Sequence, residues 1–493
     1  MNPHSYLACD LSADCGRVML GHLENGKLTI EEIHRFPNDP IRVLGTLRWD
    51  PIRIFQELKT GLRKAAEQER AIESLSVNSW GADYVFIRKD QPLLSLPFHF
   101  SDSRTDATFG TGILHASRKV IFENTGIQLS PSHTLYQLLS DQKCTPYLLK
   151  TAEHFLLMGD YLNYLFSGVV AAEESLASTT QLYDSERRAW SHALIHLFGF
   201  PERLFPQTVP SGSVLGLILP EVSEDEGLPR EVKVVATCSH GTAAAVAAAP
   251  AEGNDWAYLI SGTWSLVGME LPSPCVSSES RELEFNNEAA YGGGTCFQKT
   301  VVGLWLLEEA RRAWIDAGEE YGFAELDRLA EECEPLRSII RPSAERFLQP
   351  GDMPDKIRDY CRETGQPEPE SVGEFVRCIY ESLSLLYRSA LYDIHLLTGR
   401  NIQRLHVVGG GSQSRFFNQC IANATEINIV AGPVEATAIG NVLIQGVALR
   451  HLESLQSLRK VCADSFRIET FHPLASVMWQ SAFERFGDLD VEF

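Results

Sequence analysis

The chain has 493 residues, enough for two large domains that each bury a hydrophobic core. Hydrophobic residues make up 44% of it and charged residues 22%, as in ordinary globular proteins, while the formal net charge is −22. So acidic a chain lacks the basic surface that nucleic acids and anionic membranes require, and neither is expected as a partner.

The N-terminal stretch and the cysteines predict a cytoplasmic protein. The first residues, MNPHSYLACDLS, lack the basic and apolar segments of a secretory signal, and no apolar run reaches the ~18 residues of a membrane helix. The 11 cysteines show no metal-binding spacing and are expected to be reduced. Cys361 and Cys378 are the one pair considered for a disulfide, but the compartment favours the thiols.

Residues 6–23, YLACDLSADCGRVMLGHL, predict a β-hairpin: an apolar strand, a polar turn and a second apolar strand. Turns of this kind present backbone N–H groups to anions. An ordinary hairpin without a ligand is the alternative.

Residues 74–106 predict a buried strand that runs into Trp80, followed by a hairpin that turns at residues 89–92. Trp80, Asp83 and Asp102 together suit a sugar pocket, in which an aromatic face covers the ring and carboxylates bind hydroxyls. The alternative is that Trp80 is a core residue and that the two carboxylates cap turns.

Residues 237–246, TCSHGTAAAV, predict a polar turn before an alanine-rich helix. His240 and Thr242 flank Gly241 in this turn. The arrangement is typical of a site, yet its central residue has no side chain for acid–base chemistry.

The second half of the chain predicts another hairpin and, after it, a glycine-rich turn between a strand and a helix. Residues 256–271, WAYLISGTWSLVGMEL, predict a second hairpin roughly 250 residues after the first, which suggests an internal duplication. Long helices are expected at 303–316 and 373–398. Residues 404–425 then predict a strand, three glycines and a helix, a unit that suits a phosphate-bearing ligand but is common in α/β proteins. A further strand and helix follow, so the overall pattern is α/β.

This ordered series resembles the FGGY family of carbohydrate kinases, most closely its rhamnulokinase members, over nearly the whole chain. The motifs that carry the resemblance are DLSADCGRVML, SWGADYVFI, DYLNYLFSG…STTQLYD, ISGTWSLVG, GLWLLEE, CRETGQPEPES and VVGGGSQ…AGPVEATAIGN. The resemblance implies an α/β fold of two actin-like (ribonuclease H-like) domains with an ATP cleft between them. The N-terminal domain (1–245) would carry the sugar site and first phosphate loop, and the C-terminal domain (246–460) the second loop and adenosine site, before an extension (461–493).

The resemblance also implies a reaction and its residues. ATP, with Mg²⁺ as cofactor, would donate its γ-phosphate to the 1-hydroxyl of a deoxyketose such as L-rhamnulose, and the protein would be a monomer or small homo-oligomer. Asp10 would lie on the metal side. The nucleotide would contact Ala13, Asp14, Cys15, Gly16, Arg17, Thr263, Glu308 and Gly410, and the sugar would contact Gly81, Asp83, His240, Thr242 and Thr300.

One departure from the family affects the chemistry directly. The rhamnulokinase turn reads His-Asp-Thr, and its aspartate accepts the proton of the sugar hydroxyl, whereas this chain has Gly241 in that slot. His240, or a water held by Asp83, is a substitute base. Thr300 replaces an asparagine, Glu308 a glutamine, and Asp14 a small hydroxyl residue.

Several interpretations of Gly241 remain open at this stage. The chain is a sugar kinase slowed by the loss of its base, a non-catalytic sugar- or nucleotide-binding sensor or scaffold, or a kinase with an introduced Asp-to-Gly change. An actin-like ATPase would share the two loops but gives no reason for the sugar-type strand at 74–87.

Overall fold

The computed structural model describes residues 3–69, 71–474 and 476–489. The chain forms two units, each assembled from three segments. The first comprises Met1–Ala248, Glu270–Phe297 and Ala436–Ser465; the second comprises Ala249–Met269, Gln298–Glu435 and Phe466–Phe493. Two segments of the first unit therefore lie beyond residue 245. The compact units are not divided by a single boundary at that residue, which marks only the order of the motifs along the chain.

The first unit is built on a sheet whose strands follow the order β13-β14-β6-β1-β2-β3. Strands β1, β2 and β3 form an antiparallel meander, β6 and β14 run parallel to β1, and β13 is antiparallel to β14. Their bounds are His4–Leu11 (β1), Cys15–Glu24 (β2), Lys27–Pro37 (β3), Ile72–Asn78 (β6), Ser213–Leu217 (β13) and Lys233–Ala236 (β14). The hairpin expected at residues 6–23 is confirmed as β1 and β2.

The second unit repeats this plan in six strands of a seven-stranded sheet, in the order β18-β16-β15-β19-β20-β21, and β17 (Asn286–Ala289) pairs with β18 at the edge. Again a hairpin, here β15 and β16, is followed by two strands parallel to its first strand and then by an antiparallel strand. The bounds are Trp256–Ser261 (β15), Trp264–Leu271 (β16), Thr295–Val302 (β18), Arg404–Val408 (β19), Asn428–Ala431 (β20) and Glu469–Phe471 (β21). The duplication inferred from the two hairpins is thus confirmed in the strand topology.

Helices cover both faces of the first unit's sheet. One face is packed with α1 (Pro51–Gln68) and α6 (Met158–Ser167), whose apolar residues join Leu7 and Leu75 in the core. Helix α1 begins where the Asp50 side chain accepts from Arg53 N, and its buried residues recur at helical spacing.

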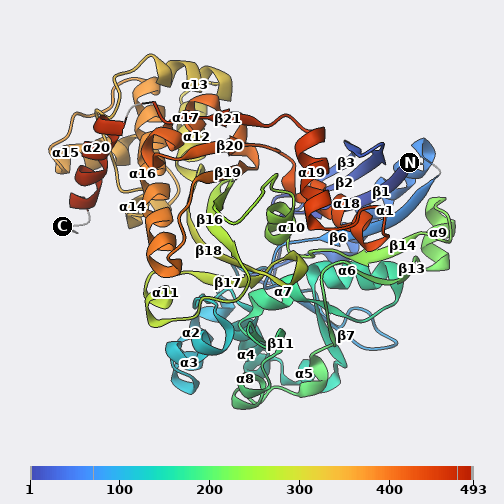
Figure 1. The fold of residues 1–493 in the computed structure, drawn as a ribbon. Helices are drawn as coiled ribbons and strands as arrows, with labels where there is room; N and C mark the ends of the chain where they lie inside the picture. The colour runs from blue at the N-terminus through green and yellow to red at the C-terminus, as the bar shows by residue number, and fades with distance from the viewer. Residues whose placement is uncertain (1–2, 70, 475, 490–493) are drawn as a thin grey trace. The chain divides into compact units, whose positions relative to one another are not determined.

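The other face of this sheet is covered from the far end of the sequence. Figure 1 shows α18 (Ala436–Ala448) and α19 (Leu455–Ser465), in red, beside the blue strands of the N-terminus. Gln445 of α18 accepts from Ser74 Oγ at 2.6 Å, and Asn441, one turn earlier, donates to Asn78 Oδ1 at 2.7 Å. Asn441 and Gln445 lie on one face of the helix, and Ser74 and Asn78 lie on one face of β6. The two elements therefore present these polar side chains to each other.

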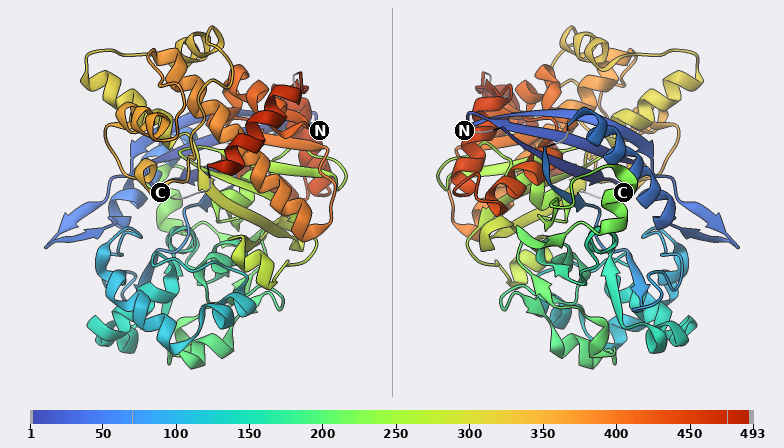
Figure 2. Two further views of the ribbon diagram at one scale, coloured as in Figure 1. Left: turned by 90° about the vertical axis from the view of Figure 1, so that its left-hand side faces the viewer. Right: turned by 90° about the vertical axis from the view of Figure 1, so that its right-hand side faces the viewer.

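A second layer of the first unit holds a separate aromatic core that includes Tyr84, Phe86 and Tyr136. The turn expected at residues 89–92 forms between Arg88 and Gln91, but the strand before it, β7, pairs with the distant β8 rather than with a strand that follows the turn. The elements of this part are β7 (Tyr84–Ile87), α2 (Asp106–His115), α3 (Arg118–Thr125), α4 (Thr134–Cys144), α5 (Pro146–Thr151), β8 (His154–Leu157), α7 (Glu174–Ala177) and α8 (His192–Leu197). In Figure 2 a short hairpin, β4 (Ile41–Val43) and β5 (Thr46–Arg48), projects in blue from its unit.

The helices of the second unit confirm both long helices expected from the sequence, as α12 and α16. Ser371 and Glu374 form a capping box at the start of α16, and Gly399 ends it in the left-handed conformation. The main helices are α12 (Trp305–Asp316), α13 (Phe323–Glu331), α15 (Met353–Glu363), α16 (Val372–Thr398), α17 (Arg415–Thr425) and α20 (Ser476–Asp488). None of the 11 cysteines, all of which lie among the described residues, forms a disulfide, and Cys361 and Cys378 are both thiols. Among the described residues, no helix combines the length and apolar character needed to span a bilayer.

Candidate functional site

The turn that contains Gly241 lies beside the end of strand β6. Ser79 N donates to the Ser239 carbonyl at 2.8 Å, and Gly241 N donates to the Ser79 carbonyl at 3.2 Å. Strands β1, β6 and β14 are parallel, so their carboxyl ends meet at one edge of the sheet. Ligands of α/β sheets characteristically bind at such an edge.

Gly241 is the first residue of the helix α10 (Gly241–Ala247), which His240 precedes as the N-cap residue. Gly241 does not have the positive φ that only glycine adopts easily. A Cβ at this position would lie 3.2 Å from Thr437 Cγ2 and 3.5 Å from Asn78 Nδ2. The backbone therefore accepts a side chain here, and that side chain would start beside Asn78.

Asn78 connects this position to Asp10. Asn78 Nδ2 donates to Asp10 Oδ1 at 2.8 Å, and Arg17 Nη2 donates to Asp10 Oδ2 at 2.5 Å. The carboxylate is only 8% exposed, so the ion pair is well shielded from water. Asp10 and Arg17 were expected at the site, whereas Asn78 and its partner Asn441 were missed. Asn78 is the last residue of β6, and Asn441 is a buried polar residue in the largely apolar helix α18.

The first loop is a tight turn between β1 and β2. Cys15 N donates to Ser12 Oγ at 3.1 Å, and Asn38 Nδ2 donates to the Ser12 carbonyl at 2.7 Å. Asn38 N donates to the Asp14 carbonyl at 3.0 Å. These bonds hold Ala13 and the exposed Asp14 at the tip of the loop.

Gly16 follows this loop for a packing reason. A Cβ on Gly16 would lie 2.2 Å from Phe36 Cζ, so a larger residue would displace the Phe36 ring from the core.

His240 makes an ion-pair contact on the other side of the turn. Its Nδ1 lies 3.1 Å from Glu288 Oε2, and its side chain is 16% exposed. Glu288 also acts on the half-buried His133, although desolvation dominates there and lowers the pKa of His133 to about 4. His240 therefore has a carboxylate neighbour within ion-pair distance.

Glu173 stabilises the turn at residues 239–242 through hydrogen bonds. Its buried carboxylate accepts from Ser239 N at 2.9 Å and from Ser175 N at 3.0 Å, and also from the hydroxyls of Ser175 and Ser211. Ser175 Oγ in turn accepts from His240 N at 3.0 Å. Burial raises the pKa of Glu173 to about 7, against these donors, which lower it. The sequence interpretation missed Glu173, whose signal was an acidic pair in an apolar stretch.

Asp83 organises the tryptophans of the predicted sugar pocket. It is fully buried, and its oxygens accept from Trp49 Nε1 at 2.6 Å, Trp80 Nε1 at 2.9 Å, Gln137 Nε2 at 2.7 Å and Phe100 N at 3.1 Å. Burial raises the pKa of Asp83 to about 6 in spite of these donors. With four donors on one buried carboxylate, the position of Asp83 explains how Trp80 is held.

The other residues of the predicted sugar pocket are placed as follows. Asp102 caps a turn, as the alternative interpretation expected, because it accepts from Arg104 N at 3.0 Å. Gly81 is packed against Thr179, whose Oγ1 would lie 2.7 Å from a Cβ on the glycine. Thr242 is partly exposed in the first turn of α10.

In the second unit, the glycine turn lies against the end of β15. A Cβ on Gly409 would lie 3.0 Å from the Ser261 carbonyl, and one on Gly411 would lie 2.0 Å from Ser261 Oγ. A Cβ on Gly410 would meet nothing within 4 Å, and this glycine is exposed. Two of the three glycines thus serve packing, while Gly410 presents open backbone.

The second hairpin turn is held by the start of α12. Gly303 N and Trp305 N both donate to the Thr263 carbonyl, each at 3.1 Å, and leave the Thr263 side chain exposed. Thr300 is also exposed near the end of β18, and Glu308 lies one turn into α12, where it pairs with Arg311 at 3.2 Å.

Comparison with known proteins finds the same family in both parts of the chain. The N-terminal domain model of the FGGY family of carbohydrate kinases matches residues 5–247, and the C-terminal domain model matches residues 257–449. The chain is 38% identical over 482 residues to a rhamnulokinase of Bacteroides thetaiotaomicron, covering 98% of each chain. It is 36% identical over 488 residues to a rhamnulokinase of Pectobacterium atrosepticum, covering 98% of this chain and 96% of the other.

Solved structures agree on the fold. A gluconate kinase from Lactobacillus acidophilus superposes with a TM-score of 0.84 at 16% identity, covering 99% of this chain and 98% of the other. A Plasmodium falciparum glycerol kinase with ADP superposes with a TM-score of 0.81 at 14% identity, covering 99% of each chain. The predicted actin-like α/β fold is confirmed, and the chain belongs to the FGGY family of carbohydrate kinases.

Proposed function

We propose that this chain transfers the γ-phosphate of ATP to the 1-hydroxyl of a deoxyketose such as L-rhamnulose, at a rate limited by the missing carboxylate at Gly241. The similarity to rhamnulokinases over 98% of the chain supports the substrate class. The observation that carries the proposal is the meeting of Asp10, Asn78 and the turn at 239–242 at one sheet edge.

The residues at this edge fit a magnesium ion. Mg²⁺ in phosphoryl-transfer sites is usually bound by one or two carboxylates together with the phosphates of the substrate. Asp10 offers such a carboxylate at the end of β1, with Arg17 as the neighbouring cation. When bound, Mg²⁺ neutralises charge on the phosphates. Arg17 and the backbone N–H groups of Ala13 and Asp14, at the tip of the loop, would orient the same phosphates.

We infer that His240 accepts the hydroxyl proton in the absence of an aspartate. It lies next to Gly241, and Glu288, 3.1 Å from Nδ1, would stabilise the imidazolium that forms. Phosphoryl transfer relies mainly on positioning and electrostatics, so the reaction tolerates a weaker or displaced base.

A specific observation also favours a second function, that of a non-catalytic sugar- and nucleotide-binding protein. Position 241 would accept a side chain if Thr437 Cγ2, 3.2 Å from the added Cβ, shifted slightly, yet it holds glycine, which supplies no acid–base group. Binding without turnover would follow if no neighbouring group replaced the aspartate.

A coupled assay of ADP release across a panel of ketoses separates these functions. Sugar-dependent ADP release by the wild type, lost in the isosteric variant Asp10→Asn, supports the kinase. Calorimetric binding of both ADP and a ketose with no release above that of Asp10→Asn supports the binding protein. Binding of neither ligand at millimolar concentration contradicts both.

A further inference from the structure

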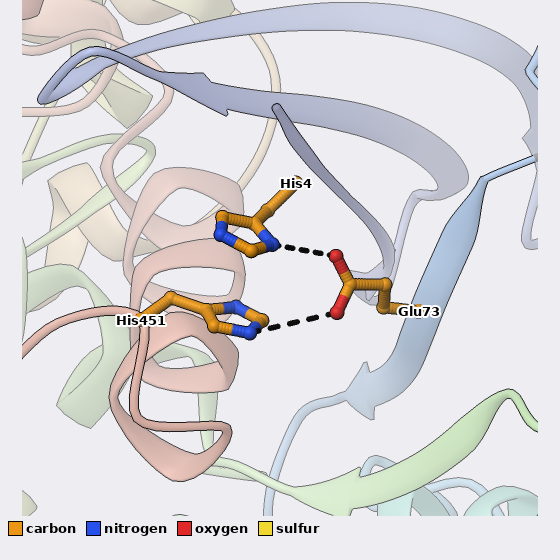
Figure 3. A group of neighbouring side chains, drawn as sticks. All are labelled: His4, Glu73 and His451. Atoms are coloured by element: carbon orange, nitrogen blue, oxygen red, sulfur yellow. Dashed lines mark hydrogen bonds and ion pairs between the residues drawn. The ribbon is translucent and has the colours of Figure 1, made fainter. Parts of the chain in front are cut away.

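We propose that His4, Glu73 and His451 form a binding site for a zinc-class divalent cation, away from the kinase site. The three residues come from the start of β1, the start of β6 and the turn after α18. Their ligand atoms all lie within 4.8 Å of one another. Figure 3 shows both imidazole rings turning a nitrogen toward the carboxylate of Glu73.

A break in strand register aims Glu73 at the two histidines. Ser5 pairs with Ile72 and Tyr6 pairs with Ser74, so Glu73 is an extra residue between two consecutive partners of β1. Such bulges re-aim a side chain, are rare in parallel pairs and occur preferentially at functional positions. The bulge therefore serves to bring the carboxylate to the end of the sheet.

The orientation of His451 is fixed by a second hydrogen bond. Its Nδ1 lies 2.6 Å from Tyr6 Oη, which leaves Nε2 to face Glu73 Oε2 at 3.5 Å. Histidines that bind metals characteristically use their other ring nitrogen in this way, which holds the ring and its ligand nitrogen in place. Tyr6 is fully buried on β1 and is a rigid partner.

The spacing is close to that of a tetrahedral ion. With bonds of ~2.0–2.1 Å, neighbouring ligand atoms of a tetrahedral zinc lie roughly 3.3 Å apart. The distance of 3.5 Å from Glu73 Oε2 to His451 Nε2 matches this value. His4 Nδ1 lies 2.6 Å from the other carboxylate oxygen, Oε1, and must draw back by less than an ångström. The rings now stack at 3.6 Å and 12°, so they must also tilt for their lone pairs to converge.

The chemistry and exposure of the group also suit an ion from solution. Two imidazoles and one carboxylate are typical zinc ligands, and a water would fill the fourth position. The side chains are between 18% and 36% exposed, which gives the ion access and gives the rings room to tilt. Lys233, whose charge acts on His451, opposes a cation and limits the affinity. A bound ion would tie the returning segment 436–465 to the N-terminal strand.

Calorimetric titration of the EDTA-treated full chain with ZnCl₂ tests the proposal. We expect one saturable site per chain with a micromolar or lower dissociation constant, accompanied by a rise in Tm. Glu73→Gln and His451→Ala should each weaken binding at least tenfold. Tyr6→Phe, which removes only the orienting hydroxyl, should weaken it by about 10- to 100-fold, as loss of an outer hydrogen bond typically does.

A matched control exists on α8. His192 and His196 both approach Glu202, at 3.1 and 2.9 Å, but these side chains are 74%, 70% and 53% exposed. His192→Ala should leave the zinc affinity unchanged. Far-UV circular dichroism of every variant separates loss of binding from loss of the fold. The proposal is overturned if the wild type shows no saturable site, if Glu73→Gln and Tyr6→Phe bind as the wild type does, or if His192→Ala removes the site.

Discussion

Replacing Gly241 with aspartate should raise sugar-dependent ATP turnover. The introduced side chain would begin with its Cβ 3.5 Å from Asn78 Nδ2, which already donates to Asp10. It would therefore enter the group of residues proposed to bind the metal and the sugar hydroxyl. The neighbouring negative charge of Asp10 would raise the pKa of the new carboxyl, which suits a general base near neutral pH.

The size of the gain follows from general-base catalysis. A positioned base contributes about 10²–10⁴ in rate, or roughly 3–5 kcal/mol of barrier. The cost in stability should be small, because position 241 has no left-handed backbone and its Cβ would press only on a methyl group of Thr437 at 3.2 Å. A carboxylate in the first turn of α10 also gains about 0.3–1 kcal/mol from the helix dipole. We expect the net change in stability to stay within about 1 kcal/mol.

The assay compares initial rates of ADP release with L-rhamnulose for the wild type, Gly241→Asp, Gly241→Ala and His240→Ala. Gly241→Ala is the matched control because it adds the same Cβ without the carboxylate, and we expect no gain from it. His240→Ala should slow the wild type if His240 accepts the proton. A wild type that is already fast, with Gly241→Asp slower, would refute the reasoning that this slot lacks a needed base.

Two further predictions concern stability. Since burial raises the folded pKa of Asp83 to about 6, the unfolded form loses its proton first, and Asp83 stabilises the fold less as pH rises from about 4 to 6. The destabilisation caused by Asp83→Asn should thus shrink by about 1.4 kcal/mol between pH ~5 and pH ~8, as measured by urea unfolding followed by tryptophan fluorescence. If this destabilisation instead grew with pH, the four hydrogen-bond donors would outweigh burial in setting the pKa of Asp83. Gly440→Ala should lower Tm, because the added Cβ would lie 2.0 Å from the Ala244 carbonyl oxygen of α10 and cost ~1–3 kcal/mol of stability. Gly446→Ala in the same helix, whose added Cβ would have nothing nearer than 3.4 Å, should leave Tm unchanged or raise it. Equal Tm changes in the two variants would contradict the close contact between α18 and α10.

The sequence predicted those parts of the fold that depend on local patterns. The hairpins β1–β2 and β15–β16 follow from alternating apolar strands around small polar turns, and α16 follows from its apolar periodicity and capping residues. The pairing of β7 with β8 was missed because it joins segments about 70 residues apart, for which the turn at residues 89–92 gives no signal.

The candidate site was predicted in its motifs but not in its supporting contacts. Asp10, Arg17 and the turn around Gly241 follow from the family resemblance. The partners that hold them, Asn78 and Glu173, come from other elements, and no local pattern marks a hydrogen bond between distant strands. The burial of Asp83 could not be predicted from the sequence either, because the stretch Trp80–Asp83 gives no sign of whether the carboxylate binds a ligand or the tryptophan N–H groups.

The same limit applies to the glycines after β19. The three consecutive glycines predict that a ligand approaches the backbone closely. Only the structure shows that a Cβ on Gly410 would meet no atom within 4 Å, whereas Gly409 and Gly411 pack against Ser261.

Identification of the reaction product tests the central proposal most directly. The wild type is incubated with ATP, Mg²⁺ and L-rhamnulose, and the mixture is analysed by ³¹P NMR, with sugar-free and Asp10→Asn samples as controls. The proposal predicts a new phosphate-ester signal coupled to the C1 protons of the sugar, in an amount equal to the ADP formed. Release of inorganic phosphate without a sugar phosphate, or no phosphate transfer at all with ATP and sugar both bound, would contradict it.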